Sequence, residues 1–239
     1  MEPREIIKNL EVTASVPLWK GDRFSGYGVI GQPFLSGHVL ALRRFPASSL
    51  GIGYTTVWHR DPAGQWTFYS TVAPELGCAR FFGGVIRRNV VAPIQIEWTS
   101  GTGFRVAIEN TLQWEVVLQA SLRGALMNAV SSLMPESCWR NRRVLKMMST
   151  AARLGLGAGP MKLTGRTPNG YEFVANPRRV WLMRTSLAKL NGVDLGASGA
   201  LEIQAELGDF LIPQRGVFAT ATVSLERPKS RMQFSEAAA

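Results

Sequence analysis

Short runs in which apolar and polar residues alternate make up most of the chain, and turns containing Gly, Pro, Asn or Asp separate them. Two neighbouring runs each place three apolar side chains on one face: Ile94, Ile96 and Trp98, then Phe104, Val106 and Ile108. Pairing Trp98 with Phe104 brings both sets onto the same face and sets Glu97 opposite Arg105 on the other. The pattern therefore predicts an antiparallel hairpin, which a third strand over residues 112–118 extends.

A second hairpin is predicted over residues 54–72, around the turn Asp61-Pro62-Ala63-Gly64. Asp favours the first turn position, Pro fixes φ at the second, and Gly suits the last. If Arg60 pairs with Gln65, one face carries Val57, His59, Trp66 and Phe68, and the other carries Tyr54, Thr56, Trp58 and Tyr69. Aromatic side chains on both faces favour the wall of a barrel that is packed outside and lined inside.

Helical periodicity replaces this pattern between residues 119 and 156. Two sets of apolar residues recur at helical spacing: Leu122, Leu126, Ala129, Val130 and Leu133, then Val144, Met148, Ala151 and Ala152. Pro135 separates the two sets, and the run GLGAGP at residues 155–160 ends the second. Two helices are therefore predicted, after which strand patterns return and continue to residue 225.

These patterns predict a mainly β protein: an antiparallel lipocalin-like barrel, in one or two lobes, with a central helical segment. Within the 239 residues we expect a β-rich lobe at 1–118, a helical connector or lid at 119–156, a second lobe or the completion of the same barrel at 157–227, and a flexible tail at 228–239. Barrels of this length are common as single units, so length alone leaves the domain count open.

The composition is that of an ordinary globular protein, since 46% of the residues are apolar and 18% are charged. Residues 1–10 show neither the apolar core nor the small-residue cleavage site of a secretory signal, and no apolar run reaches the roughly 18 residues of a membrane span. We therefore expect a soluble, cytoplasmic protein. Cys78 and Cys138 stand far apart, which argues against a disulfide framework or a zinc site and predicts two buried thiols.

The net charge of +10 raises the question of an anionic partner. Much of the excess lies in three separate segments, residues 140–153, 178–184 and 227–231. Basic residues that are spread over the chain in this way do not by themselves indicate nucleic-acid binding, so we expect no nucleic-acid partner. Four cations share the polar side of the second predicted helix: Arg142, Arg143, Lys146 and Arg153. They form either a solvated face or a surface that docks on anionic lipid, so peripheral membrane contact stays an alternative. The oligomeric state stays open.

No motif of a known catalytic class is present, and the two histidines, His38 and His59, are too few for a three-histidine metal site. We expect neither a metal nor a cofactor. The densest group of functional side chains is Trp58-His59-Arg60-Asp61. If His59 projects into a cavity, it can act as a general base or a polar anchor, with Asp61 or Glu115 as its carboxylate partner. The alternative is a structural histidine, hydrogen-bonded on the apolar face, with Asp61 as a turn former.

Large aromatic side chains are the main candidates for lining a ligand pocket, because the chain carries seven Trp, most of them in predicted strands. The alternative is that these rings only pack the core. Arg123 falls on the apolar arc of its predicted helix, so its guanidinium needs an acceptor, either an anionic ligand head group or an internal carboxylate such as Glu115. The candidate ligand-binding residues are Trp58, His59, Trp66, Tyr69, Trp98, Trp114 and Arg123.

Three segments carry a family resemblance: VWHRDPxGxWTFY at residues 57–69, TGRxPNG at 164–170 and IPQRG at 212–216. Across nearly its whole length the chain resembles a bacterial-type family that carries these motifs and has no assigned activity. Its strand-rich layout also resembles the lipocalin-like proteins grouped with hydroxyneurosporene synthase. That second resemblance implies paired β-barrel lobes that bind or act on isoprenoid-like molecules.

The resemblance and the aromatic content together predict a protein that binds a hydrophobic small molecule, of the isoprenoid, fatty acid or polyketide type, in a barrel cavity. One alternative is a cofactor-free hydratase, isomerase or cyclase that acts on such a molecule through His59 and a carboxylate, Asp61 or Glu115. Another is a protein that associates with anionic surfaces through its basic helix. The sequence leaves open whether the protein is an enzyme.

Overall fold

The computed structural model describes residues 2–119, 122–135 and 137–227, so the predicted tail at 228–239 lies outside the described residues. The helices are α1 (Pro3–Thr13), α2 (Ala79–Phe82), α3 (Leu122–Leu133) and α4 (Arg142–Leu156), with short 3₁₀ turns at Pro74–Leu76, Gly83–Val85 and Cys138–Arg140. The strands are β1 (Asp22–Pro33), β2 (Val39–Ser48), β3 (Tyr54–Arg60), β4 (Trp66–Ser70), β5 (Ile86–Val91), β6 (Gln95–Trp98), β7 (Gly103–Ile108), β8 (Leu112–Gln119), β9 (Thr164–Arg166), β10 (Glu172–Leu190), β11 (Val193–Asp194), β12 (Glu206–Leu207), β13 (Phe210–Leu211) and β14 (Val217–Glu226).

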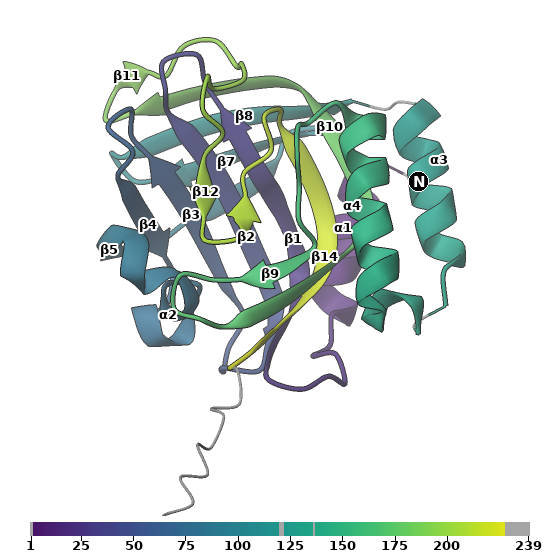
Figure 1. Cartoon of the computed structure of the whole chain (residues 1–239). Coiled ribbons are helices and arrows are strands. Elements are labelled where there is room, and N and C mark those ends of the chain that lie inside the picture. The colour runs from purple at the N-terminus through teal and green to yellow at the C-terminus, as the bar shows by residue number, and fades with distance from the viewer. Residues whose placement is uncertain (1, 120–121, 136, 228–239) are drawn as a thin grey trace, which may run out of the picture.

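One large sheet dominates the molecule, with the strand order β5-β4-β3-β2-β1-β14-β10-β8-β7-β6 and with β9 and β11 paired to β10 (Figure 1). The prediction of a mainly β protein is confirmed. Every pair is antiparallel except β4 with β5, which residues 71–85 connect as the crossover that parallel neighbours require. The strands from both halves of the chain therefore belong to the same sheet.

The predicted closed barrel is wrong for the part of the chain described, because β5 and β6 lie unpaired with each other at opposite ends of the strand order. Only residues 92–94 connect these two end strands along the chain. A link of this length spans at most about 14 Å, so the ends of the sheet must approach each other. The sheet is thus strongly curled without a complete ring of hydrogen bonds.

The hairpin β6–β7 has the predicted register, with Trp98 opposite Phe104 and Glu97 opposite Arg105. The third strand, β8, pairs with β7 as expected. The alternation of apolar and polar residues predicted this register correctly, because shifting one strand by one residue would turn all of its apolar side chains to the polar face.

The predicted register of β3 with β4 is wrong by one residue. Arg60 pairs with Trp66, so Trp58 lies opposite Phe68 on one face and His59 lies opposite Thr67 on the other. The backbone N–H of Gly64 donates to the carbonyl of Asp61, and Gly64 takes a φ of +86°. Residues 62–64 form a three-residue loop, in which a turn is followed by a glycine in the left-handed conformation. The connection between the paired residues is therefore one residue longer than the predicted pairing of Arg60 with Gln65 allows.

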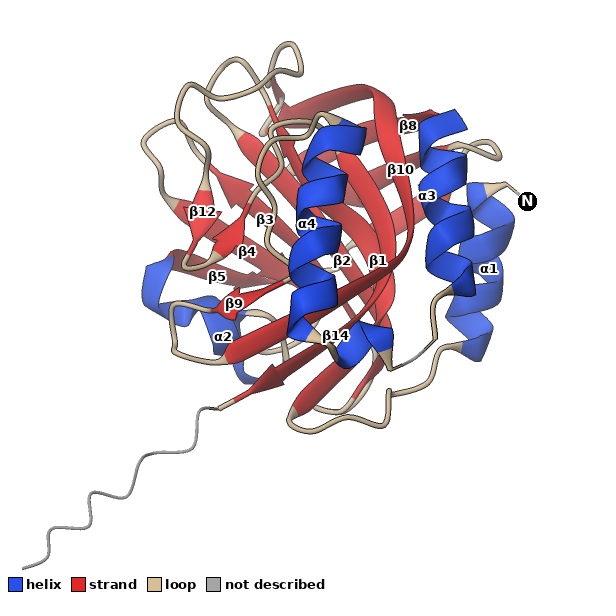
Figure 2. Ribbon diagram, turned by 45° about the vertical axis from the view of Figure 1, so that its right-hand side comes forward, coloured by secondary structure: helices blue, strands red, loops and turns tan. Residues whose placement is uncertain are grey.

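Helices α3 and α4 confirm the two predicted helices, and they run side by side along one side of the sheet (Figure 2). The backbone N–H groups of Arg143 and Val144 donate to the Asn141 side chain at the start of α4. Gly157, at φ 59°, ends the helix. No helix in the described ranges combines the length and the apolar character that a membrane span requires.

The predicted core face of α3 is wrong. Leu126, Val130 and Leu133 are 67%, 54% and 83% exposed, whereas Asn128 is buried against β10. Pairing of β8 with β10 stops at Leu182, so β8 does not pair with the backbone of Val180. The side-chain amide of Asn128 donates to the Val180 carbonyl at 3.0 Å and accepts from the Val180 N–H at 2.7 Å. A need for hydrogen bonds at the end of a strand pair thus determines which side of α3 faces inward.

Two apolar cores lie on opposite faces of the β1–β4 region. The first is enclosed by the curl of the sheet and contains Val29, Leu40, Val57, Trp114 and Phe218. The second lies on the outer face, where α2 and the β12–β13 hairpin cover it, and contains Phe24, Tyr54, Trp58, Phe68 and Phe210. Four aromatic side chains of β3 and β4 belong to this second core, and Tyr69 alone packs against the first, so the rings are concentrated on one face of these strands and not divided between the faces as predicted.

Candidate functional site

Two adjoining voids lie beside the second core. The central cavity, of about 90 Å³, lies over β1, β2, β10 and β14, and Gly28, Ala219 and Ala221 are among its lining residues. The aromatic pocket, of about 60 Å³, extends toward α2, where Tyr54, Trp58, Cys78 and Phe81 line it. Both voids share five lining residues: Arg43, Phe45, Ala175, Phe210 and Val223.

Small side chains create the central cavity. Alanine or glycine stands where β1, β10 and β14 face it, at Gly26, Gly28, Ala175, Ala219 and Ala221. A Cβ atom at Gly26 or Gly28 would lie 1.9 Å from a β2 carbonyl oxygen, so only glycine allows this approach of β1 to β2. The void therefore depends on residues whose role is to leave space.

Arg43 is the one charged residue in the lining that the two voids share. Its guanidinium donates to the carbonyls of Val29, Leu42 and Ile30, the last at 3.0 Å. These acceptors lie where the β1–β2 pairing is irregular, between the Tyr27–Arg44 and Gln32–Leu40 pairs. Arg43 thus bridges a bulge in the sheet.

The charge of Arg43 is held between aromatic rings. Its Cζ atom lies 4.6 Å from the Trp58 ring centroid and 5.5 Å from that of Phe210. Burial lowers the pKa of Arg43 to about 10, so it remains a cation at neutral pH. Arg43 nevertheless keeps partial solvent accessibility, because it lines the cavity.

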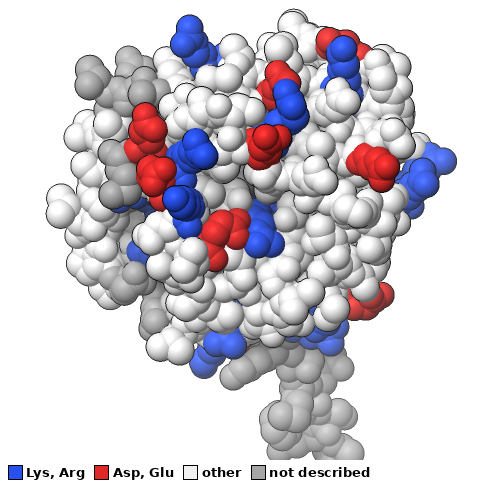
Figure 3. All heavy atoms as spheres, turned by 180° about the vertical axis from the view of Figure 1, so that it is seen from behind, with Lys and Arg blue, Asp and Glu red and all other residues white. Residues whose placement is uncertain are grey.

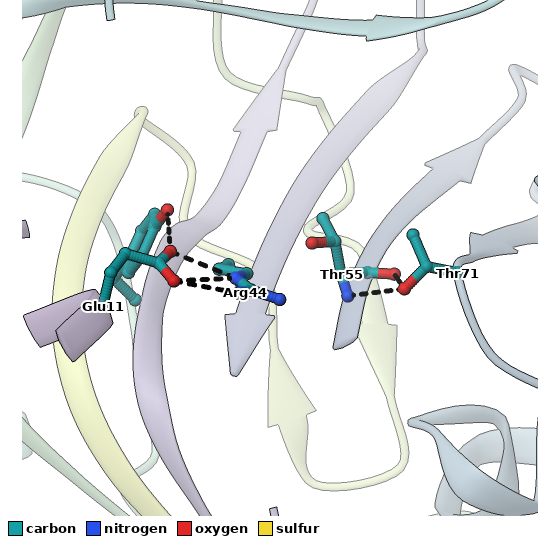
Figure 4. Close-up of polar contacts among 5 residues, drawn as sticks. Glu11, Arg44, Thr55 and Thr71 are labelled. Atoms are coloured by element: carbon teal, nitrogen blue, oxygen red, sulfur yellow. Dashed lines mark hydrogen bonds and ion pairs between the residues drawn. The ribbon is translucent and has the colours of Figure 1, made fainter. Parts of the chain in front are cut away.

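The neighbouring Arg44 provides a contrast. It points to the other face of β2, where Glu11 of α1 accepts from its Nε and Nη2 atoms at 3.1 and 2.9 Å (Figure 4). The Tyr27 hydroxyl also donates to Glu11, at 2.7 Å. Arg43 has no such partner, since no carboxylate among the described residues forms an ion pair with it or lines either void.

Further hydrogen-bonding groups surround the aromatic pocket. Trp58 is 1% exposed, and its Nε1 atom has no hydrogen-bond partner among the described residues. The Tyr54 hydroxyl and the Cys78 thiol lie within hydrogen-bond distance, at 3.3 Å. Burial raises the pKa of Cys78 to about 11, so the thiol stays protonated at neutral pH. Cys78 is buried as predicted, whereas Cys138 is half-buried, and both are free thiols.

A basic groove of about 490 Å³ adjoins the central cavity, and the two share Met161, Lys162, Leu163 and Leu211. Its charged lining residues are Arg142, Lys146, Arg153, Lys162 and Asp209. The β12–β13 hairpin contributes to both, since Asp209 lines the groove, Phe210 lines the cavity and Leu211 lines both. Asp209 of its turn accepts from Lys162 at 2.6 Å and from the backbone N–H of Arg166 at 2.9 Å, which ties the hairpin to β9.

Positive charge is distributed differently on the far side of the molecule. There, Lys and Arg side chains are interspersed with Asp and Glu side chains (Figure 3). This face carries no single-sign patch of the kind that binds a nucleic-acid backbone, and the absence of a nucleic-acid partner stays a prediction.

His59 lies on the opposite face of β3 from Trp58, outside the lining of both voids. Its Nε2 atom is 2.9 Å from Nδ1 of His38, and the two rings stack at 5.1 Å. Burial, and then the charge of His38, lower the pKa of His59 to about 4. Burial also lowers the pKa of His38. The two imidazoles are therefore neutral at pH 7, and one donates a hydrogen bond to the other.

The other two predicted catalytic candidates, Asp61 and Glu115, also lie outside the lining of both voids. Asp61 serves the turn, where its Oδ1 atom accepts from the N–H of Gln65 at 2.8 Å. Glu115 is exposed and paired with Arg105. No group of three or more potential metal-ligating side chains occurs among the described residues.

Of the predicted ligand-binding residues, only Trp58 lines one of these two voids. Trp66 is buried in the second core, and Tyr69 and Trp98 are half-buried against the first. Trp114 is fully buried and donates through Nε1 to Ser186 at 2.8 Å. The side chain of Arg123 lies outside the described residues.

The sequence reasoning missed Arg43, Tyr54, Cys78 and Phe210 as a group. One signal was available: the apolar strand pattern of residues 39–45 contains two consecutive arginines. Because successive side chains point to opposite faces, a strand that is buried on both faces must turn one of these arginines into each core.

The fold and the site together define a curled β-sheet protein with an apolar cavity that is lined by one half-buried arginine, Arg43. No protein-family model matches the chain, and no curated protein matches it. Among solved structures, the acetoacetate decarboxylase of Legionella pneumophila subsp. pneumophila str. Philadelphia 1 is similar, with 10% identity, a TM-score of 0.38 and coverage of 92% of this chain and 93% of that one. A second acetoacetate decarboxylase structure has 10% identity, a TM-score of 0.43 and coverage of 95% and 96%. Similarity this distant transfers no activity to this chain.

Proposed function

We propose that this chain binds a small, mainly apolar molecule in the central cavity and the aromatic pocket. The observation that carries the proposal is the pair of adjoining voids in an otherwise packed core, lined by small residues and aromatic rings. Protein interiors tolerate few voids larger than a water molecule, because each one forfeits packing energy. Voids that open toward a groove are typical of a ligand site.

The size of the voids limits the ligand. Their volumes of about 90 and 60 Å³ together match the roughly 150 Å³ of an apolar cavity that holds benzene. A compact ring or a short chain fits inside. A longer molecule of the isoprenoid, fatty acid or polyketide type can insert only one end, with its remainder in the basic groove.

Native mass spectrometry followed by organic extraction tests whether such a molecule co-purifies. A titration with benzyl alcohol, followed by NMR, then tests the location. Ala175 lines both voids, so Ala175→Leu fills them and should weaken binding about tenfold or more. The milder Ala221→Val should weaken it less, which guards against misfolding of the leucine variant.

The matched control is Ala151→Leu, which adds the same atoms on the exposed side of α4. It should leave the affinity unchanged. Equal affinity in the wild type, the Ala175→Leu variant and the Ala221→Val variant would place the ligand elsewhere and reject the proposal.

Association with an anionic membrane surface is a second candidate function, favoured by the exposed apolar stripe on α3. Leu126, Val130 and Leu133 are exposed there, and the basic helix α4 lies beside α3 (Figure 2). Apolar side chains next to cations suit an interface between lipid head groups and acyl chains.

Co-sedimentation with phosphatidylserine-containing vesicles tests this second candidate. Binding should be lost in the double variant Arg143→Glu/Lys146→Glu and kept in the control Lys20→Glu/Lys189→Glu, which reverses two exposed charges outside the helices. No binding to these vesicles, or equal loss in both variants, would remove the candidate.

A further inference from the structure

Arg43 brings a positive charge into the apolar core without bringing a negative one. The ionisable groups that act on its pKa are the Cys78 thiol and the Tyr54 hydroxyl, and both are neutral at pH 7. Transfer of a cation from water into such surroundings is costly unless an anion accompanies it. Arg44, on the other face of the same strand, shows the usual solution, because the carboxylate of Glu11 neutralises it.

The bulge in β1 accounts for only part of this arrangement. Three backbone carbonyls inside the irregular stretch accept from Arg43, so the residue has a structural role. Carbonyl dipoles satisfy N–H donors but supply no opposite charge. These three bonds use only the Nη1 and Nη2 atoms, whereas the guanidinium carries five N–H donors. A purely structural role would also not require the guanidinium to line two voids.

We infer that the ligand of this cavity is an organic acid, whose carboxylate pairs with Arg43 and whose compact apolar body fills the space beside the aromatic rings. The inference rests on the proposed function and assigns the ligand's chemical class. A carboxylate beside Arg43 gains charge-assisted hydrogen bonds in surroundings of low dielectric constant. Trp58 also lines the aromatic pocket, and its buried indole N–H has no hydrogen-bond partner among the described residues.

The surroundings of the opening agree with an acid ligand. The basic groove next to the central cavity carries four cations, Arg142, Lys146, Arg153 and Lys162, against one carboxylate, Asp209. Such an excess raises the local concentration of anions and speeds their association at low salt. An organic acid is therefore attracted first by the cations of the groove and then by Arg43 in the cavity.

The test compares benzoate with its neutral isostere benzamide at pH 7 and constant ionic strength, by calorimetry or NMR titration. The wild type should bind benzoate at least about tenfold more tightly than benzamide. Arg43→Met should lose this preference. Arg44→Met, its neighbour on the opposite face, should keep it.

Because Arg43 also supports the bulge, the methionine variant needs a measurement that does not depend on its folding. Benzoate should shift the side-chain Nε–H resonance of Arg43 in the wild type, and benzamide should not. Equal affinities for the two probes, or a benzoate preference that survives Arg43→Met, would overturn the assignment while leaving an apolar binding site in place. Failure of benzoate, benzamide and benzyl alcohol alike would instead overturn the proposed function itself.

Discussion

At the scale of single residues, neighbouring side chains of β2 and β3 have opposite environments because a strand turns successive residues to opposite faces. Arg43 lines the voids, whereas Arg44 binds Glu11 at the outer end of the first core. In the same way Trp58 stacks on Phe68 at 4.5 Å, whereas the adjacent His59 pairs with His38. Residue type alone does not reveal which of two neighbours faces a cavity.

The neutral histidine pair predicts a pH dependence of stability. The folded state holds the pKa of His59 at about 4, below the ordinary value of about 6.5 in the unfolded chain. As the pH falls from 7 toward 4, the unfolded chain takes up a proton that the folded protein does not, so the free energy of unfolding decreases. The loss should be on the order of 2 kcal/mol and should be absent from His59→Gln, as measured by urea denaturation at several pH values.

His38→Gln is the control for this prediction, because it removes the hydrogen bond but leaves His59 buried. Burial is the largest cause of the lowered pKa of His59, so most of the pH dependence should remain in that variant. If the wild type and His59→Gln lost the same free energy between pH 7 and pH 4, the neutral buried state of His59 would be wrong.

At the scale of elements, the β12–β13 hairpin is the smallest piece that the site depends on. Phe210 of this hairpin covers Arg43, and Leu207 is completely buried in the second core. Gly208 takes a φ of +62°, and a Cβ atom there would lie 2.8 Å from the Arg166 carbonyl. The hydrogen bonds of Lys162, first, and then of the Arg166 N–H hold the pKa of Asp209 below its ordinary value. The Asp209 carboxylate therefore helps to attach the hairpin to β9, together with the hydrogen bond that the Asp209 N–H donates to the Arg166 carbonyl at 2.8 Å.

Asp209→Asn should loosen this attachment, because the uncharged amide pairs more weakly with Lys162. Hydrogen exchange of residues 206–211 should accelerate severalfold, while the global free energy of unfolding should change by less than about 1 kcal/mol, since the ion pair is exposed. Mass spectrometry after deuterium labelling measures both regions at once.

Asp194→Asn is the matched control for the hairpin, since Asp194 is an exposed residue at the end of β11 whose carboxylate accepts from the Gly196 N–H. It should change exchange only around its own turn. Unchanged exchange at 206–211 in Asp209→Asn would show that apolar contacts of the hairpin are enough to keep it closed.

At the scale of the whole molecule, the arrangement of the two cores determines where the two voids lie. The first core lies inside the curl of the sheet and holds the large rings of Trp114, Phe104 and Phe218. The second lies between the outer face of the sheet, α2 and the β12–β13 hairpin, and the two voids lie beside it. The prediction placed the ligand inside a barrel, whereas the cavity occurs on the outer face of a sheet that stays open.

The sequence alone was enough where the determining interactions are local. It predicted the mainly β class, the register of β6 with β7, and both central helices, because alternation, turn residues and helical periodicity act within about twenty residues. It failed at β3–β4, where a single left-handed glycine changed the register and with it the face of every side chain.

Only the tertiary structure decided the site. Arg43 and Trp58 come from the first quarter of the chain, whereas Ala175, Phe210 and Ala221 come from its last third. Their meeting requires β10 and β14 to enter the sheet beside β1, a long-range pairing that no local pattern encodes. A cavity also depends on the residues that face one another across it. An alanine or glycine in a strand leaves a space only if the residues packed opposite do not fill it, and the sequence does not show which residues those are.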